Sequence, residues 1–417
     1  AKRVSCSHLF RPAAMSSSSS CRLVAALVLV SSLTGCTSDR RTDAERAIRF
    51  DTLPGGAVVV TNSERGIWDS ASAWRLVEEL RIGRVDGDGP DAFSDVHDIA
   101  VDGAGNVYVL QRITKSIHVF DPTGRFVRTI GRAGKGPGEF EHPNGMAFDP
   151  AGRLWVADPK NGRYVAFDTL GGVLRSARRE LDSYRFQWDG TVDSAGRILE
   201  SVSVWSDSGR STAYVRFDTT FATADTILTS APRSQEEMLA TTYVLRRGSG
   251  ETLFLGVPFA PEDVATHDPR GYLWTANTGD YRIVQRDFNG DTIRVVARGA
   301  SPLPVTSEER AAAIARLDSL AQGVRYDASR IPSTHPVLEW FAVAPDGTLW
   351  VALTARDGAA ERLFDVFDAE GRYLGQVTVP RGLQPPVRVT RDAIYAVVRD
   401  ELDVPMVVRL RVVRPAN

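Results

Sequence analysis

The chain is poor in cysteine, and the position of its few cysteines excludes a disulfide-stapled fold. The three cysteines are Cys6, Cys21 and Cys36, and none follows residue 36. A chain without a pair of cysteines to oxidise cannot be held together by disulfide bonds after export. Its 417 residues, of which 43% are hydrophobic, are enough to form a core without such bonds.

The sequence also lacks the motifs that mark several classes of enzyme site. It has no helical motif of two histidines flanking a glutamate, no nucleophile elbow and no paired-cysteine zinc cluster. The glycine-rich segment 131–136 lacks the ending of a phosphate-binding loop, and Pro90 stands where an Asp86–Gly89 calcium loop would need a third ligand. With a formal net charge of −2, the chain has no basic excess for nucleic acid.

The apolar run at residues 23–33 is too short to cross a bilayer as a helix, but it has the length of a signal-peptide core. It ends in Leu33-Thr34-Gly35-Cys36, which resembles a bacterial lipobox, where the chain is cut before an acylated cysteine. We therefore expect residues 1–35 to be a signal peptide and Cys36 to carry lipid. Met15 is a plausible start, which would make residues 1–14 an over-extension of the reading frame.

Acylation of Cys36 predicts a cell-envelope protein held stably on a membrane, because two or more acyl chains give lasting attachment. By resemblance to sorted lipoproteins, Thr37 after the cysteine favours the outer membrane. Removal of the signal takes four basic residues and no acid, so the formal charge falls from −2 to −6. We expect residues 36–72 to be a lipid-anchored tether and the mature protein to be a monomer.

A unit with an acidic turn, a glycine and an apolar strand recurs from residue 73 onward. The first two copies are 47 residues apart. Two later pairs of neighbouring copies are separated further, by insertions near 230–256 and 300–336. A sixth, degenerate copy has Asp392-Ala393 where the others have the glycine. The glycines of the first five copies are Gly105, Gly152, Gly196, Gly271 and Gly347.

Each copy predicts four short antiparallel strands. Alternating apolar residues in the first copy predict strands at 98–101, 107–110, 117–120 and 126–130, with turns at 103–105 and 121–124. Units of this length with four strands are typical of propeller blades. The sequence therefore predicts an all-β, six-bladed β-propeller over residues 73–417.

The two ends of the repeat region are complementary. Residues 74–82 match the fourth strand of the repeat, but the first three strands of that copy are missing before them. The last copy has the opposite gap: it provides the first three strands, at 387–389, 393–398 and 406–413, and lacks the fourth. Pairing between them would complete the last sheet and remove two exposed sheet edges. We expect the N- and C-terminal strands to close the propeller in this way.

The insertions carry helix signals. Thr306-Ser-Glu-Glu309 is a capping box, Ile314, Leu317 and Ala321 share one helix face, and Gly323 is a stop. Ser234 begins a similar but weaker segment. We expect both insertions to lie on one face of the propeller.

The segment 140–149, together with Gly152–Asp158, Asn161 and Arg163, resembles an NHL repeat. NHL-type propellers are six-bladed and include protein-binding and RNA-binding modules, and related six-bladed folds include calcium-dependent lactonases and amidating lyases. The resemblance thus implies a fold and leaves the function open. We interpret Asp158 and Arg163 as residues that hold a blade together.

The position eight residues before each turn glycine begins the innermost strand, near the mouth of the axial channel. We predict that this ring of residues binds the ligand: His97, Asn144, Trp188, Asp263 and Glu339. All but the tryptophan could ligate a cation, and the resemblance to lactonase-like propellers implies calcium. A polar, water-filled rim explains the same residues without a metal. His142 and His335 are expected to overhang the mouth.

Two functions remain open. We favour a membrane-anchored module that binds a protein, peptide or glycan, because the copies are degenerate and no catalytic constellation is recognisable. The alternative is a metal-dependent hydrolase, lactonase or lyase, in which the ion polarises a carbonyl and His97 or His142 acts as base. RNA binding is a third option, which export and the charge of −6 oppose.

Overall fold

The structure is a computed structural model of the 417-residue chain, and contacts divide it into residues 1–40 and 41–417. The predicted signal peptide and Cys36 lie outside the described residues. No helix in the described part is long and apolar enough to span a membrane. The described residues are 47–179, 188, 191–206, 209–218, 220–221, 223–228, 234–248, 250–287, 289–356, 361–380 and 382–415.

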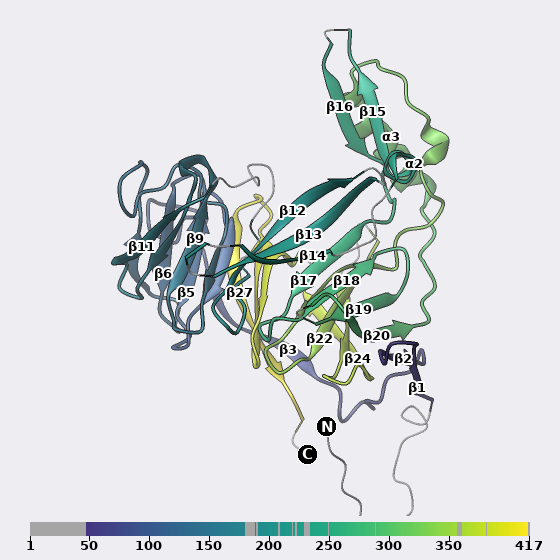
Figure 1. The fold of residues 1–417 in the computed structure, drawn as a ribbon, viewed down its shortest axis with the longest axis horizontal. Helices are drawn as coiled ribbons and strands as arrows, with labels where there is room; N and C mark the ends of the chain where they lie inside the picture. Colours follow the sequence, from purple (N-terminus) through teal and green to yellow (C-terminus); the bar gives the residue numbers. More distant parts are fainter. Residues whose placement is uncertain are drawn as a thin grey trace, which may run out of the picture. The chain divides into compact units, whose positions relative to one another are not determined.

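Antiparallel sheets follow one another along the second unit (Figure 1). The first sheet has the order β4-β5-β6-β7, and its strands begin and end within one residue of their predicted bounds. They are β4 (Asp98–Val101), β5 (Val107–Gln111), β6 (Ser116–Phe120) and β7 (Phe126–Ile130).

The second and third sheets continue the same meander. The second consists of β8 (Met146–Phe148), β9 (Leu154–Asp158), β10 (Arg163–Phe167) and β11 (Val173–Arg178), with the 3₁₀ turn η1 (Pro159–Asn161) between β9 and β10. In the third sheet, a single bridge between Val192 and Ile198 takes the place of the innermost strand. Its three strands are β12 (Ile198–Ser206), β13 (Gly209–Phe217) and β14 (Thr223–Leu228).

The fourth and fifth sheets each contain four strands of the repeat. The fourth consists of β17 (Asp263–His267), β18 (Leu273–Asn277), β19 (Arg282–Arg286) and β20 (Thr292–Arg298). The fifth consists of β21 (Leu338–Val343), β22 (Leu349–Leu353), β23 (Glu361–Phe367) and β24 (Tyr373–Pro380).

The sixth sheet joins the two ends of the repeat region. Its strands are β25 (Gln384–Val389), β26 (Ala393–Arg399), β27 (Pro405–Val413) and β3 (Arg75–Ile82), in that order. β3 is antiparallel to β27, with Ile82 opposite Val407 and Arg75 opposite Val413. The predicted pairing of the N- and C-terminal strands is thus confirmed.

The tether predicted over residues 36–72 is wrong for its described part, residues 47–72. β1 (Arg49–Thr52) and β2 (Val58–Asn62) extend the fourth sheet, because β2 pairs in parallel with β20. Burial of Val59 and Val60 favours this docking. The Asn62 amide donates to the Gly371 carbonyl at 3.0 Å and accepts from the Tyr373 amide at 2.7 Å, which fastens the segment to the fifth sheet as well.

An aspartate turn between the third and fourth strands marks every copy of the repeat. In each, the carboxylate accepts a hydrogen bond from the backbone N–H two residues later, at 2.8–3.1 Å. The residue three positions after the aspartate has a positive φ each time, and it is glycine in four copies. The six aspartates are Asp121, Asp168, Asp218, Asp287, Asp368 and Asp400.

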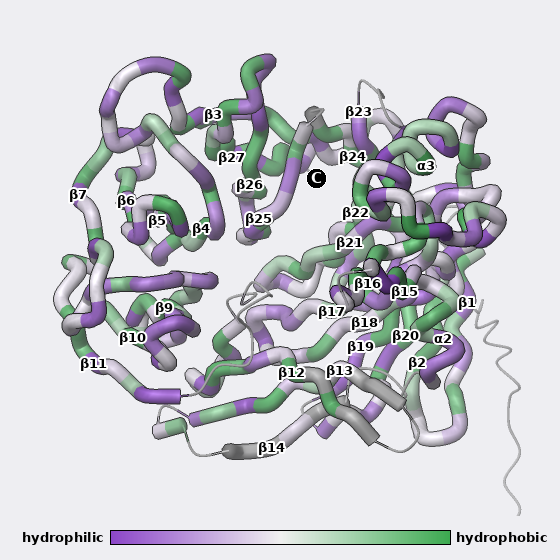
Figure 2. Tube along the Cα trace, turned by 90° about the horizontal axis from the view of Figure 1, so that it is seen from above, coloured by the Kyte–Doolittle hydropathy of each residue, from purple (hydrophilic) through white to green (hydrophobic). Residues whose placement is uncertain are grey.

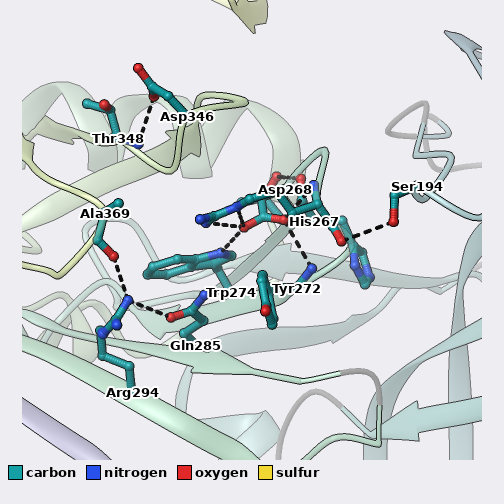
Figure 3. Close-up of polar contacts among 12 residues, drawn as sticks. Ser194, His267, Asp268, Tyr272, Trp274, Gln285, Arg294, Asp346, Thr348 and Ala369 are labelled. Carbon is teal, nitrogen blue, oxygen red and sulfur yellow. Dashed lines mark hydrogen bonds and ion pairs between the residues drawn. The ribbon is translucent and has the colours of Figure 1, made fainter. Parts of the chain in front are cut away.

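A second aspartate, in the turn after the innermost strand, supports a buried tryptophan. Trp155 Nε1 donates to Asp149 at 2.9 Å, and Trp274 Nε1 donates to Asp268 at 3.0 Å. Figure 3 shows Asp268 beside Trp274 and Tyr272. In the fifth sheet Ala344 occupies the equivalent position, so the Trp350 indole has no such carboxylate beneath it.

Successive sheets are linked by an arginine that donates to a backbone carbonyl of the next aspartate turn. Arg294 donates to the Ala369 carbonyl at 2.6 Å, linking the fourth sheet to the fifth (Figure 3). Arg128 makes the same contact with Thr169 in the second sheet. In the sixth sheet, Arg409 donates to Pro122 of the first at 3.0 Å.

The two insertions pack against each other in a small core of their own. They comprise α2 (Gln235–Ala240), β15 (Thr242–Arg246), β16 (Thr252–Gly256), α3 (Ser307–Ala321) and η2 (Ala328–Arg330). Both predicted capping boxes are present. Leu317 and Ala321 pack with Tyr243, whose hydroxyl donates to the Asp327 carbonyl at 2.9 Å.

Candidate functional site

The innermost strands line a common cavity. Figure 2 shows β4, β17, β21 and β25 on the inner side of their sheets. A cavity of about 270 Å³ is lined by residues from all six sheets, among them Ala100, Met146, Val192, Thr266, Val343 and Arg388. A second cavity of about 250 Å³ shares Thr266 and Arg388 with the first and adds Trp340, Pro385 and Pro386 to the wall.

His97 and Asn144 meet at the start of the innermost strands. Their side chains come from equivalent positions of the first two sheets, and His97 Nε2 lies 3.3 Å from Asn144 Oδ1. The backbone fixes both in the same way, because each N–H donates at 2.8 Å to a carbonyl of the neighbouring strand, Leu110 for His97 and Ala157 for Asn144. The prediction that this repeat position brings successive sheets together is thus confirmed for this pair.

His142 lies close enough to this pair to be influenced by it. Its backbone N–H donates to Asp158 Oδ1 at 2.8 Å. Partial burial, followed by the charges of Arg112 and His97, lowers the pKa of His142. The neutral imidazole is therefore favoured, and it offers one hydrogen-bond donor and one acceptor.

Asp158 and Arg163 hold the second sheet together, as interpreted from the sequence. Asp158 is buried and accepts from the backbone at residues 141 and 142 and from Asn161 Nδ2 at 2.6 Å. Arg163 donates to the carbonyls of Gly136 and Glu139, both at 2.8 Å. Both side chains thus fasten the connector before β8 to the second sheet.

The other three predicted ring residues contact parts of their own or neighbouring sheets. The Trp188 ring is buried against Tyr164, and its Nε1 donates to the Leu199 carbonyl at 2.7 Å. Asp263 accepts from Asn277 Nδ2 at 2.8 Å. Glu339 pairs with Arg362 on β23 at 2.5 Å.

The predicted metal set of His97, Asn144, Asp263 and Glu339 is therefore not assembled. Among the described residues, no group of three or more His, Cys, Asp or Glu side chains is placed to hold a metal ion. The physical reason is local pairing, since Asp263 and Glu339 already have partners within their own sheets. The expectation that His335 overhangs the mouth is also wrong, because His335 Nε2 lies 3.0 Å from Glu309 of α3.

Two groups at the channel were missed by the sequence analysis. Arg388 Nη2 donates to the buried carboxylate of Asp98 at 2.6 Å, and burial raises the pKa of Asp98. His267 is buried with its ring edge-to-face on Tyr214, and neither ring nitrogen has a hydrogen-bond partner. Burial, with a smaller contribution from Arg216, lowers the pKa of His267 to about 3. The available signal was a charged or polar residue inside an otherwise apolar strand.

Comparison with known proteins agrees on the fold. A family model described as a 6-bladed β-propeller, DUF5128, matches residues 88–185, which span the first two sheets. The search of curated proteins returned no match. The chain thus has a β-propeller fold.

Solved structures with similar coordinates share little sequence. A Bacteroides fragilis protein, provisionally assigned as exported, is 12% identical, with 85% of this chain and 100% of that chain covered and a TM-score of 0.49. A DUF4221 family member from Bacteroides vulgatus is 12% identical, with 83% and 100% covered and a TM-score of 0.45. A gluconolactonase from Xanthomonas campestris is 15% identical, with 76% and 86% covered and a TM-score of 0.34. At these identities the likeness says nothing about function.

Proposed function

We propose that this chain is an exported, lipid-anchored propeller of the NHL type that binds a protein, peptide or glycan ligand at the mouth of its axial channel. The observation that carries the proposal is the cavity lined by residues of all six sheets, five of which contribute their innermost strand. Ligand sites are concave and combine apolar walls with converging polar groups, and this cavity has apolar walls beside Thr266, His267 and Arg388. The cavity is lined mainly by the last residues of these strands, whereas His97 and Asn144 meet just before the first residues of β4 and β8, toward the other end of the channel.

The proposal includes a closed ring of six blades. Contacts between the last and first sheets support closure: Arg388 pairs with Asp98, and Arg409 donates to Pro122. The packed cluster that contains Ile99, Phe120, Tyr395 and Val407 spans the same junction. Pairing of β3 with β27 covers the edge that each of these strands would otherwise expose, which stabilises the scaffold without disulfides.

Binding is favoured over catalysis by how the polar groups near the mouth are used. Asp158 accepts three hydrogen bonds from residues of its own sheet and of the connector before it. Its carboxylate is therefore not available to orient a histidine that would act as a base. His97 Nε2 lies 3.3 Å from the amide oxygen of Asn144. Such groups recognise a ligand by hydrogen bonding and do not provide an activated nucleophile.

The binding proposal is tested with the detergent-solubilised full chain on peptide and glycan arrays. We expect specific hits that are lost when His97→Ala and Asn144→Ala are combined. The matched control is Arg125→Ala, in the turn at the other end of β6, whose side chain is exposed. Hits that survive the double substitution, or that are lost equally in the control, would overturn the proposed site.

The anchoring proposal is tested separately by metabolic labelling with a radioactive fatty acid. We expect label in the wild-type protein and none after Cys36→Ser, which should also move the protein from the membrane to the soluble fraction. Equal labelling of both proteins would contradict lipidation at Cys36.

A further inference from the structure

The hairpin formed by β1 and β2 is the outermost part of the fourth sheet. β2 pairs with β20, whereas β1 pairs with β2 alone among the described strands, so that β1 ends the sheet. All four residues of β1 are exposed, and Phe50 is 55% exposed. On β2, by contrast, Val59 and Val60 are buried. β2 thus fastens the hairpin to the propeller, and β1 presents its side chains outward.

The turn of this hairpin is uncharged and open. Residues 53–57 read Leu-Pro-Gly-Gly-Ala, and Leu53 is 37% exposed beside an exposed Pro54. Beyond their chain neighbours, no atom of a described residue lies within 4 Å of the place that a Cβ would take on Gly55 or Gly56. Phe50, Leu53 and Pro54 therefore form an exposed apolar surface, which we call the hairpin surface.

The hairpin surface lies a short length of chain away from the proposed lipid. Twelve residues stand between Cys36 and Arg49, the first residue of β1. Even fully extended, a chain of that length spans only about 45 Å. Acyl chains on Cys36 would therefore hold β1 within that distance of the bilayer. Contact between the hairpin and the lipid is then intramolecular, so that a small apolar surface is enough to maintain it.

The charges around the hairpin point to neutral rather than anionic lipid. β2 runs parallel to β20, so the turn that precedes β20 lies at the same end as the hairpin turn. The corresponding turn of the fifth sheet is adjacent, because Arg294 of β20 donates to its Ala369 carbonyl. The acids at this end at least offset the cations. The cations are Arg49, Arg294 and Arg372, and the acids are Asp51, Asp287, Asp291, Asp368 and Glu370.

We infer that the hairpin surface lies in the headgroup region of the membrane that holds the acyl chains of Cys36, where it contacts neutral phospholipid. The inference rests on the proposed lipid anchor and adds a second, protein-borne contact to it. Burial of Phe50 and Leu53 at the interface favours the contact. The hairpin stays at headgroup depth because Arg49 and Asp51 flank Phe50, and charges are costly in the hydrocarbon core.

The test uses the scarcity of cysteine. No cysteine follows Cys36, and acylation consumes the Cys36 thiol, so Leu53→Cys supplies the one free thiol of the processed protein. A nitroxide label is attached there, and the lipidated protein is reconstituted into phosphatidylcholine vesicles. We expect collisions of the label with a water-soluble nickel chelate to be reduced several-fold, while collisions with oxygen, which dissolves in lipid, are increased.

The matched control is the same label at Leu170→Cys. Leu170 is 78% exposed in a turn of the second sheet, and its label should remain open to the nickel chelate. Adding Phe50→Ser to the Leu53-labelled protein should return its label toward water. Adding Cys36→Ser should do so fully, because the hairpin surface is too small to hold the protein on a membrane without the acyl chains.

Flotation of the protein with the vesicles separates the possible failures. If the protein floats but the label at 53 is as open to nickel as the label at 170, the inference is overturned and the lipid anchor stands. If the protein neither floats nor takes up fatty acid, the anchor fails and the inference fails with it. A label at 53 that is protected in Cys36→Ser without any lipid would instead indicate a contact between two copies of the chain, which also overturns the inference.

Discussion

Arg388 on β25 and Asp98 on β4 form an ion pair between the last sheet and the first, with Nη2 and Oδ1 2.6 Å apart. The other oxygen of Asp98 accepts from the backbone N–H of Met146 in the second sheet at 2.8 Å. One carboxylate therefore links three successive sheets. It lies one residue after His97, so the packing of this junction also positions the mouth.

Removal of Asp98 should be strongly destabilising. Asp98→Ala leaves Arg388 and the Met146 N–H without their acceptor in a buried place, and we expect a loss of about 3–5 kcal/mol in the free energy of unfolding. Urea denaturation of Asp98→Ala, Arg388→Ala and the double variant measures the coupling between them. The double variant should lose less than the sum of the singles.

The matched control for this double-mutant comparison is the exposed ion pair between Glu78 and Arg81 on β3. Glu78→Ala should change stability by no more than about 1 kcal/mol, because exposed ion pairs are solvated and screened. Strict additivity of the Asp98 and Arg388 losses would contradict direct coupling.

Because His267 is buried in its neutral form, we expect the free energy of unfolding to fall in mild acid. The unfolded imidazole takes up a proton near its usual pKa of 6.5, but the folded one does not until about pH 3. The stabilisation is therefore fully present above pH 6.5 and is lost as the pH falls toward 3, at up to about 1.4 kcal/mol per pH unit.

We expect His267→Phe to flatten this dependence in urea melts between pH 7.5 and pH 5, while the two proteins differ little in slope above pH 7. The range stops there because Glu309, whose pKa is lowered to about 2 chiefly by the Thr306 N–H, adds its own loss below its usual value of 4.5. An unchanged slope in His267→Phe would mean that another group titrates.

Substitutions of the buried tryptophans of the repeat should reduce stability by different amounts. Trp350 is 1% exposed, and Trp350→Ala should cost about 3–5 kcal/mol through the cavity it leaves. Trp155→Phe keeps a ring but removes the hydrogen bond to Asp149, so it should cost about 1–2 kcal/mol more than Trp350→Phe, where Ala344 replaces that aspartate. Equal costs for the two Phe variants in thermal or urea melts would show that the Trp155–Asp149 bond adds nothing.

The pairing of Asp263 with Asn277 and of Glu339 with Arg362 predicts that the ring of innermost-strand residues holds no tightly bound metal. No cluster of three or more ligating residues is present among the described side chains. Elemental analysis should find less than one equivalent of calcium or zinc, and a chelator should leave the melting temperature unchanged. A stoichiometric ion that is lost in Glu339→Ala would instead favour the metal-dependent hydrolase.

Strand positions could be predicted closely because the signals are local. Alternation within 98–130 and the turn residues around Asp102 and Asp121 place all four strands of the first sheet. The aspartate in the turn between the third and fourth strands is present in all six copies. The glycine in the turn between the first and second strands is replaced by Ala393 in the sixth copy, so the aspartate would have counted the copies more clearly.

The ring of ligands could not be predicted in the same way, because spacing fixes where a backbone lies and not what its side chain meets. His97 and Asn144 met as the repeat requires. Trp188 is buried in the core because its ring is large and apolar. Glu339 is paired with Arg362, whose position follows from the register between β22 and β23.

The amino-acid sequence by itself determined the strands, the count of copies and the pairing of β3 with β27, because each depends on residue periodicity within one short segment or on the complementary ends of the repeat. Only the tertiary structure decided that residues 58–62 dock beside β20, that Asp98 finds Arg388, and that the two insertions share a core. These contacts join residues far apart in the chain. They are selected by burial and charge pairing in three dimensions, for which a linear pattern carries no signal.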